Sequence, residues 1–326
     1  MGNSTLMSNQ ALIQASGLNR FYGKYHAVND FNLTLHKGEV LGLLGPNGAG
    51  KSTTMQMLTG NISPSAGEIK INGIDLLENP QQAKKSIGYL PEQPPIYRDM
   101  TSNEFLSYCA ALHDIPKSKR QAVKSLAIER CGLGDVADKL IANLSKGYQQ
   151  RVGIAQAILH QPQVVILDEP TVGLDPIQIT EIRELIRELG KDHSVILSTH
   201  ILPEVQAVCD RVQIIKQGKT VFSDSFDQLE KRQLSPVLMV GFDAVIDKAE
   251  LSSLAGVIKV DELTKNRYQL TFKETPIASS VSQLSADKGW KLNELTPQNE
   301  SLEQIFMNLI HNENLPEEIE EGITDE

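Results

Sequence analysis

The stretch GPNGAGKS at residues 45–52 constrains the fold of this chain more than any other part of its sequence. It follows the short apolar run EVLGLLG (39–45), which is typical of a buried strand, and it leads into KSTTMQMLTG (51–60), which is typical of a helix. The stretch has the form G-x-x-x-x-G-K-S/T, in which glycines let the backbone wrap closely around phosphate groups. The N-terminus of the following helix favours bound anions. The sequence therefore predicts a strand, a phosphate-binding loop and a helix in succession.

Two side chains of this stretch have specific predicted roles. Lys51 supplies a positive charge for the β- and γ-phosphates of a nucleotide, and Ser52 supplies a hydroxyl for Mg²⁺. Contacts to the nucleotide are expected along the whole loop, from Gly45, Pro46, Asn47, Gly48, Ala49, Gly50, Lys51, Ser52 and Thr53. We therefore expect a nucleotide and Mg²⁺ as the bound ligands.

A pair of acidic residues ends another predicted buried strand. VVILDE (164–169) places Asp168 and Glu169 directly after four apolar residues. Two adjacent carboxylates are costly to bury without a cation, so Asp168 is expected to reach the Mg²⁺. Glu169 is then well placed beside the γ-phosphate to orient and deprotonate water. The two segments together predict a site that hydrolyses a nucleotide.

Strand-like and helical patterns alternate along most of the chain, which predicts an α/β fold with a mostly parallel sheet covered by helices. The helical segment within about 93–160 is expected to form a separate lobe, and Ser102 is the candidate N-cap of its first helix. After EKRQLSP (230–236) the expected order is strand, helix, strand, strand, helix, strand, as in ferredoxin-like domains. A further helix is expected at 300–310.

The chain of 326 residues has a net charge of −10, and much of the excess lies in the last fifteen residues, which carry seven acidic side chains and no Lys or Arg. We expect a disordered acidic tail at 311–326. The rest of the chain is near neutral and lacks a basic surface for nucleic acid. The three cysteines show no metal or redox spacing, which fits reduced thiols. Neither a signal peptide nor an apolar run of membrane-spanning length is expected.

Four motifs follow one another in an order that resembles the nucleotide-binding subunits of ABC transporters: GPNGAGKS, LSKGYQQR, ILDEPTVGLDP and STH. The resemblance implies a P-loop NTPase cassette over 10–230, with a mostly parallel sheet core, an antiparallel β lobe and a helical lobe. It leaves 231–310 as a small accessory α+β domain, and the ending of that segment resembles the ATPase subunits of ABC-2 type exporters.

The same resemblance implies further site residues. Tyr22 is similar to an aromatic residue that stacks on adenine, and Tyr25 is the alternative. His200 is similar to a histidine that contacts the γ-phosphate, and Asp175 is similar to a residue that reaches across a dimer. The stretch GYLPEQPPIY gives two candidate metal ligands. Glu92 stands where related proteins have a metal-facing Gln, and Gln93 follows it directly.

The stretch LSKGYQQR (144–151) departs from the usual motif at Lys146 and Tyr148. Ser145 and Gly147 keep the hydroxyl and the close backbone approach that would face the γ-phosphate of a partner chain. Lys146 either touches that phosphate or faces water. Because one chain carries each motif once and the two serve opposite sites, the resemblance implies a head-to-tail dimer with two-fold symmetry.

The resemblance implies an ATP-hydrolysing subunit that pairs with a second copy and powers a separate membrane permease, with export as the direction. It would act in the cytoplasm, on the inner face of the membrane through the permease, and without nucleic acid. The accessory domain is expected to stabilise the dimer rather than to bind a small molecule. The alternatives are an ABC-type ATPase that acts on ribosomes or DNA and a catalytically idle regulatory subunit.

Overall fold

The computed structural model describes residues 10–231, 237–272, 277–298 and 302–311. The chain divides into two compact units, residues 1–226 and 227–326. Most of the predicted boundary segment and the acidic tail from 312 onward lie outside the described residues. The predicted domain limits therefore remain predictions.

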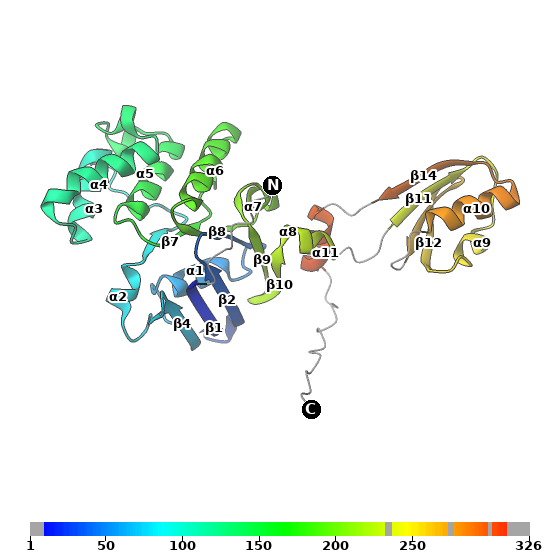
Figure 1. Ribbon diagram of the computed structural model, residues 1–326, viewed down its shortest axis with the longest axis horizontal. Helices are drawn as coiled ribbons and strands as arrows, with labels where there is room; N and C mark the ends of the chain where they lie inside the picture. The colour runs from blue at the N-terminus through cyan, green and yellow to red at the C-terminus, as the bar shows by residue number, and fades with distance from the viewer. Residues whose placement is uncertain (1–9, 232–236, 273–276, 299–301, 312–326) are drawn as a thin grey trace, which may run out of the picture. The chain divides into compact units, whose positions relative to one another are not determined.

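A mostly parallel sheet forms the centre of the first unit (Figure 1). Its six strands within residues 10–226 are β3 (Val40–Leu44), β6 (Ile87–Leu90), β7 (Val164–Asp168), β8 (Ser194–Thr199), β9 (Arg211–Lys216) and β10 (Lys219–Ser225). The strand order is β10-β9-β3-β8-β7-β6, and every pair except the β9–β10 hairpin is parallel. Because β3, β7 and β8 are buried along their whole length, the continuous apolar runs in their sequences are explained.

Register brings the carboxyl ends of three neighbouring strands together. Leu44 at the end of β3 lies opposite Thr199 of β8, and Asp168 at the end of β7 lies opposite Ser198. Loops that follow parallel strands emerge at the same edge of a sheet, which is where α/β proteins bind their ligands. The phosphate-loop sequence, the acidic pair and His200 are therefore neighbours, although the loop at 45–52 and His200 lie far apart in the sequence.

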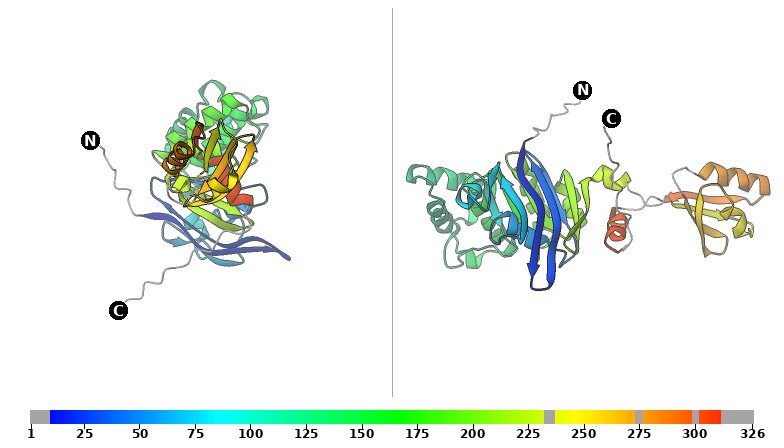
Figure 2. Two further views of the ribbon diagram at one scale, coloured as in Figure 1. Left: turned by 90° about the vertical axis from the view of Figure 1, so that its right-hand side faces the viewer. Right: turned by 90° about the horizontal axis from the view of Figure 1, so that it is seen from below.

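An antiparallel sheet packs against this centre. Its strands are β1 (Ala11–Tyr22), β2 (Tyr25–His36), β4 (Ala66–Ile71) and β5 (Ile74–Asp75), in the order β2-β1-β4-β5. The long β1–β2 hairpin is clear in the right-hand view of Figure 2. Its turn brings Tyr22 directly opposite Tyr25, so both candidate aromatic residues stand at one hairpin end.

The helices of the first unit are α1 (Lys51–Leu58), α2 (Pro80–Lys84), α3 (Ser102–Leu112), α4 (Lys117–Arg130), α5 (Lys146–Ile158), α6 (Pro176–Gly190) and α7 (Leu202–Val208). Short 3-10 turns lie at Gly134–Val136 and Ile141–Asn143. Helices α3, α4 and α5 gather on one side of the sheet as the helical lobe (Figure 1). They share with the sheet a core that includes Leu106, Ile154 and Leu167.

The predicted N-cap of α3 was wrong. Thr101 is the cap: its hydroxyl accepts a hydrogen bond from the Glu104 backbone N–H, and the Glu104 carboxylate accepts one from the Thr101 N–H at 2.8 Å. This reciprocal pair is a capping box. Ser102 lies in the first helical turn instead, fully buried, and its hydroxyl has no hydrogen-bond partner. The Glu three positions after Thr101 is the sequence signal that identifies Thr101 as the cap.

The second unit confirms the ferredoxin-like order. Its elements are α8 (Phe226–Lys231, which begins at the last residue of the first unit), β11 (Val237–Phe242), α9 (Lys248–Ser252), β12 (Val257–Thr264), β13 (Arg267–Phe272), α10 (Ala278–Lys288), β14 (Leu292–Gln298) and α11 (Leu302–His311). The sheet is antiparallel in the order β12-β13-β11-β14. Its core is built around Phe242, Leu270 and Trp290. No helix in the described part of the chain is both long and apolar enough to cross a membrane.

Two neighbouring variants test the cap of α3. Thr101→Ala is expected to lower the free energy of unfolding by about 1 kcal/mol, because the capping hydroxyl is lost. Ser102→Ala is expected to leave the free energy of unfolding unchanged or to raise it, because a buried hydroxyl without a partner is removed. Urea denaturation followed by circular dichroism measures both, and Thr101→Ser is the control that keeps the hydroxyl. A larger loss for Ser102→Ala than for Thr101→Ala would contradict this assignment.

Candidate functional site

The loop between β3 and α1 has the backbone that the phosphate-loop sequence predicts. Gly50, at the N-cap position of α1, has φ 106°, and a Cβ at this position would lie 2.6 Å from the Ala27 carbonyl oxygen. Only glycine therefore fits there. No side chain caps the N-terminus of α1, so its first N–H groups are available to an anion.

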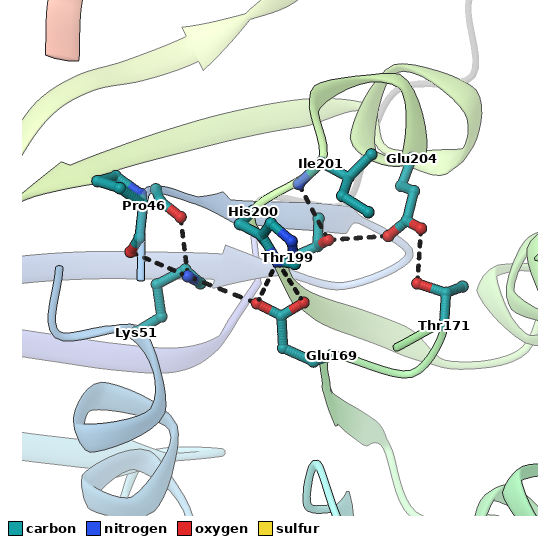
Figure 3. A network of polar contacts seen from close by, with 9 residues as sticks. Pro46, Lys51, Glu169, Thr171, Thr199, His200, Ile201 and Glu204 are labelled. Carbon is teal, nitrogen blue, oxygen red and sulfur yellow. Dashed lines mark hydrogen bonds and ion pairs between the residues drawn. The ribbon is translucent and has the colours of Figure 1, made fainter. Parts of the chain in front are cut away.

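Lys51 lies between the loop carbonyl groups and Glu169 (Figure 3). Its side chain is only 5% exposed, and Nζ donates hydrogen bonds to the carbonyl oxygens of Gly45 at 2.8 Å and Pro46 at 3.2 Å. Nζ also lies 3.5 Å from Glu169 Oε1. The buried ammonium is thus stabilised by two weak acceptors and one carboxylate, and it is available for an incoming phosphate.

Glu169 connects Lys51 with His200. It follows β7, and its backbone N–H donates to the Ser198 carbonyl at 2.9 Å. Its φ of 48° is in the left-handed region, which is uncommon for a residue other than glycine and is found at functional sites. His200 Nδ1 lies 3.0 Å and 3.2 Å from the two Glu169 oxygens. The structure therefore brings the two predicted catalytic residues into direct contact.

Asp168 has the environment of a cation ligand. It is 3% exposed, and its Oδ1 has no hydrogen-bond partner. Burial raises the pKa of Asp168, the hydroxyls of Ser198 and Ser52 lower it, and the charges of Glu169 and Glu92 raise it further. A buried carboxylate with a free oxygen, beside a hydroxyl and two more carboxylates, is a set of hard oxygen donors that fits Mg²⁺.

The protein does not complete a metal site on its own. Among the described residues, no group of three or more His, Cys, Asp and Glu side chains is arranged to hold a metal ion. Mg²⁺ is commonly bound by one or two carboxylates together with the phosphates of a substrate. Ser52 and Asp168 therefore fit a cation that arrives with a nucleotide.

A pocket of about 450 Å³ joins these groups. It is lined by Tyr22, Tyr25, Ala27, Asn47, Gly48, Gly50, Lys51, Ser52, Thr53, Glu92, Glu169, Val172 and His200. Both tyrosines reach it, and the Tyr25 hydroxyl donates to the Gly48 carbonyl at 3.3 Å. Glu92 lines the pocket whereas Gln93 does not, which favours Glu92 as the residue facing the metal.

Eight predicted site residues do not line this pocket: Gly45, Pro46, Ala49, Gln93, Ser145, Gly147, Asp168 and Asp175. Ser145 caps α5, accepting from the Tyr148 N–H at 3.4 Å, and Asp175 caps α6, accepting from the Ile177 and Gln178 N–H groups at 3.0 Å each. Gly147 is buried beside the Gln178 side chain. The Lys146 ammonium lies against Gly173 of the same chain, a position that the sequence did not suggest. The roles of Ser145, Gly147 and Asp175 toward a nucleotide remain predictions.

The sequence did not predict the hydrogen bonds of Glu204 beside this site. The Glu204 carboxylate accepts hydrogen bonds from the Thr171 hydroxyl at 2.6 Å and from the Thr199 hydroxyl at 2.8 Å (Figure 3). The two threonines stand two residues after Glu169 and one residue before His200. The only signal in the sequence was this adjacency, since a Glu early in a short helix is usually exposed.

The chain is similar to known ATP-binding proteins of transporters. The family model described as ABC transporter matches residues 28–172. The ABC transporter ATP-binding protein YxlF of Bacillus subtilis is 36% identical over 304 residues, covering 92% of this chain and 100% of that protein. The linearmycin resistance ATP-binding protein LnrL of Bacillus subtilis is 30% identical and covers 91% and 98%. The bacitracin transport ATP-binding protein BcrA of Bacillus licheniformis is 40% identical and covers 68% and 72%.

Solved structures agree on the fold. An ATP-binding subunit of an ABC transporter matches with a TM-score of 0.62 and 31% identity, over 68% of this chain and 92% of that chain. The protein cbiO1 of Clostridium perfringens, part of an ABC transporter complex, matches with a TM-score of 0.63 and 29% identity, over 69% and 92%. The predicted fold class is therefore confirmed.

Two glycine variants test the geometry of the loop. Gly48→Ala is expected to cost about 1–2 kcal/mol of unfolding free energy, because φ is 79° but the added Cβ meets no atom within 4 Å. Gly50→Ala is expected to cost about 1 kcal/mol more, because its Cβ also collides with the Ala27 carbonyl. Urea denaturation measures both values, and titration with inorganic tripolyphosphate by calorimetry reports the phosphate site. Equal losses of stability would contradict the described backbone.

Proposed function

The chain belongs to the ABC transporter ATP-binding proteins, and on that basis we propose that it is the ATP-hydrolysing subunit of an ABC-2 type exporter. The observation that carries this proposal is the contact of Lys51, Glu169 and His200 in one pocket, at the ends of three parallel strands. A binding protein without turnover needs the lysine but has no use for a carboxylate paired with a histidine.

The residues of the chain have separate tasks in this reaction. The N–H groups of loop 45–50 and of α1 bind the phosphates, and Lys51 exchanges its carbonyl acceptors for phosphate oxygens. Glu169 orients the attacking water and takes its proton, and His200 holds the carboxylate and faces the γ-phosphate. Mg²⁺ would be held by Ser52 and Asp168, with Glu92 nearby, and would neutralise part of the phosphate charge.

A second copy of the chain completes the site in this proposal. Ser145 and Gly147 lie at the N-terminus of α5, and Asp175 at that of α6, all outside the pocket of their own chain. Head-to-tail pairing would direct each Ser145 toward the γ-phosphate bound by the partner. Each chain carries one copy of either half, so a closed two-fold dimer would contain two equal sites.

Export is proposed from the relatives. LnrL and BcrA are named for resistance to linearmycin and transport of bacitracin, and the resemblance to LnrL extends through the second unit. The proposed partner is a separate membrane permease, which would hold the protein at the cytoplasmic face of the membrane. We assign the ferredoxin-like domain to stabilising the dimer. The relatives described above give no support to an action on ribosomes or DNA.

Glu169→Gln tests the proposed general base. We expect kcat for ATP hydrolysis to fall at least about 100-fold, because the amide cannot accept the proton from water. ATP binding should persist, and the variant should elute as a dimer on sizing chromatography with ATP and Mg²⁺. Glu188→Gln, an exposed carboxylate paired with Lys191, is the control and should keep kcat. A purified wild-type chain without Mg²⁺-dependent ATPase activity would contradict the proposed function.

A second test separates binding of the adenine ring from binding of the phosphates. Tyr22→Ala is expected to weaken ATP binding by about 1–3 kcal/mol through loss of stacking on adenine, while tripolyphosphate binding stays unchanged. Tyr22→Phe keeps the ring and should bind ATP like the wild type. Calorimetric titrations with both ligands, repeated for Tyr25→Ala, give the comparison. An ATP-specific loss in Tyr25→Ala but not in Tyr22→Ala would transfer the role to Tyr25.

A further inference from the structure

We propose that Glu204 is a positioning residue, which sets the geometry of the Glu169–His200 pair by tying together the two loops that carry them. This inference rests on the proposed function and adds a residue to its site. Glu204 does not line the pocket. It would act through its hydrogen bonds to Thr171 and Thr199.

The two threonines lie in the two segments that carry the catalytic pair. Thr171 lies in the turn after β7, where the Leu174 N–H donates to its carbonyl oxygen and the Val172 N–H donates to that of Glu169. Thr199 is the last residue of β8 and directly precedes His200. The carboxylate of Glu204 thus joins the segment of the proposed base to the segment of the histidine, as Figure 3 shows.

The chemistry of the link also fits a positioning role. Glu204 is 1% exposed, and no cationic side chain in the described part of the chain forms an ion pair with it within 4.0 Å. Each carboxylate oxygen instead accepts one threonine hydroxyl, and both threonines are buried. Hydrogen bonds to an ionised acceptor are shorter and stronger than neutral ones. A buried carboxylate is costly without such donors, so the three side chains hold one another in a single arrangement.

How the catalytic pair itself is held also matters. His200 has 39% of its side chain exposed, and Glu169 has a left-handed backbone that its surroundings must maintain. The Thr199 hydroxyl also accepts a hydrogen bond from the Ile201 N–H at 3.2 Å. This bond joins the two residues that flank His200 in the chain. Moving either threonine would therefore change the distance between His200 Nδ1 and the Glu169 carboxylate.

Steady-state kinetics of the full-length chain test the proposal. Glu204→Gln, Thr171→Val and Thr199→Val are expected to lower kcat about 10- to 100-fold, since small displacements of catalytic groups have effects of this size. KM for ATP should stay near the wild-type value, because the phosphate loop is untouched. Thr171→Ser and Thr199→Ser keep the hydroxyls and should retain most of kcat. If Glu204→Gln does not fold, the four threonine variants decide the question.

The matched control is Thr59→Val. Thr59 is also buried and donates its hydroxyl to the Met55 carbonyl at 2.9 Å, outside the catalytic loops. It should lower the melting temperature like the other Thr→Val changes but leave kcat unchanged. A kcat for Thr171→Val and Thr199→Val equal to that of Thr59→Val would overturn the proposal.

A double-mutant comparison separates positioning from an independent effect. In a Glu169→Gln background, Glu204→Gln should lower the residual rate by much less than it does in the wild type, because the base that it positions is already lost. An equal fold-loss in both backgrounds would overturn the inference. A wild-type chain without ATPase activity refutes the proposed function and this inference together, whereas an active wild type with an equally active Glu204→Gln variant refutes the inference alone.

Discussion

The parallel pairing of β3, β8 and β7 is the constraint on which the rest of the site depends. Main-chain register places Leu44 opposite Thr199 and Asp168 opposite Ser198, so the loops that follow these strands share one edge of the sheet. Lys51, Glu169 and His200 then meet without any long side chain reaching across the molecule. Because the strands are buried along their length, a shift of register would also disturb the core, and the geometry of the site is tied to folding itself.

Charge balance is the second principle of the site. Asp168, Glu169 and Glu204 are all buried at this edge, and Lys51 is the buried cation among them. Each carboxylate is stabilised differently: Glu169 by Lys51 and His200, Glu204 by two hydroxyls, and Asp168 incompletely. Asp168 has a raised pKa and an oxygen without a hydrogen-bond partner, which is the physical reason to expect a cation beside it.

The sequence predicted much of this arrangement because several of its signals are local. A glycine-rich loop between an apolar run and a helix is a specific signal for a phosphate-binding loop. Gly50 shows the reason, since its backbone position excludes a Cβ. The order of elements in the second unit was also predictable from the sequence, since strands and helices differ in the periodicity of their apolar residues. The error at Ser102 has a local cause as well: two adjacent hydroxyl residues compete for one cap, and the partner Glu104 decides.

The sequence by itself determined the chemistry: which residues can bind phosphate, which can ligate a cation and which can accept a proton. It also determined the elements that carry them, because backbone propensity and apolar spacing act over a few residues. Only the tertiary structure showed which of two neighbours lines the pocket, Glu92 rather than Gln93, and only it revealed the contacts of Glu204. The reason is that burial and hydrogen-bond partners arise between segments far apart in the chain, and no local pattern specifies which side chains meet there.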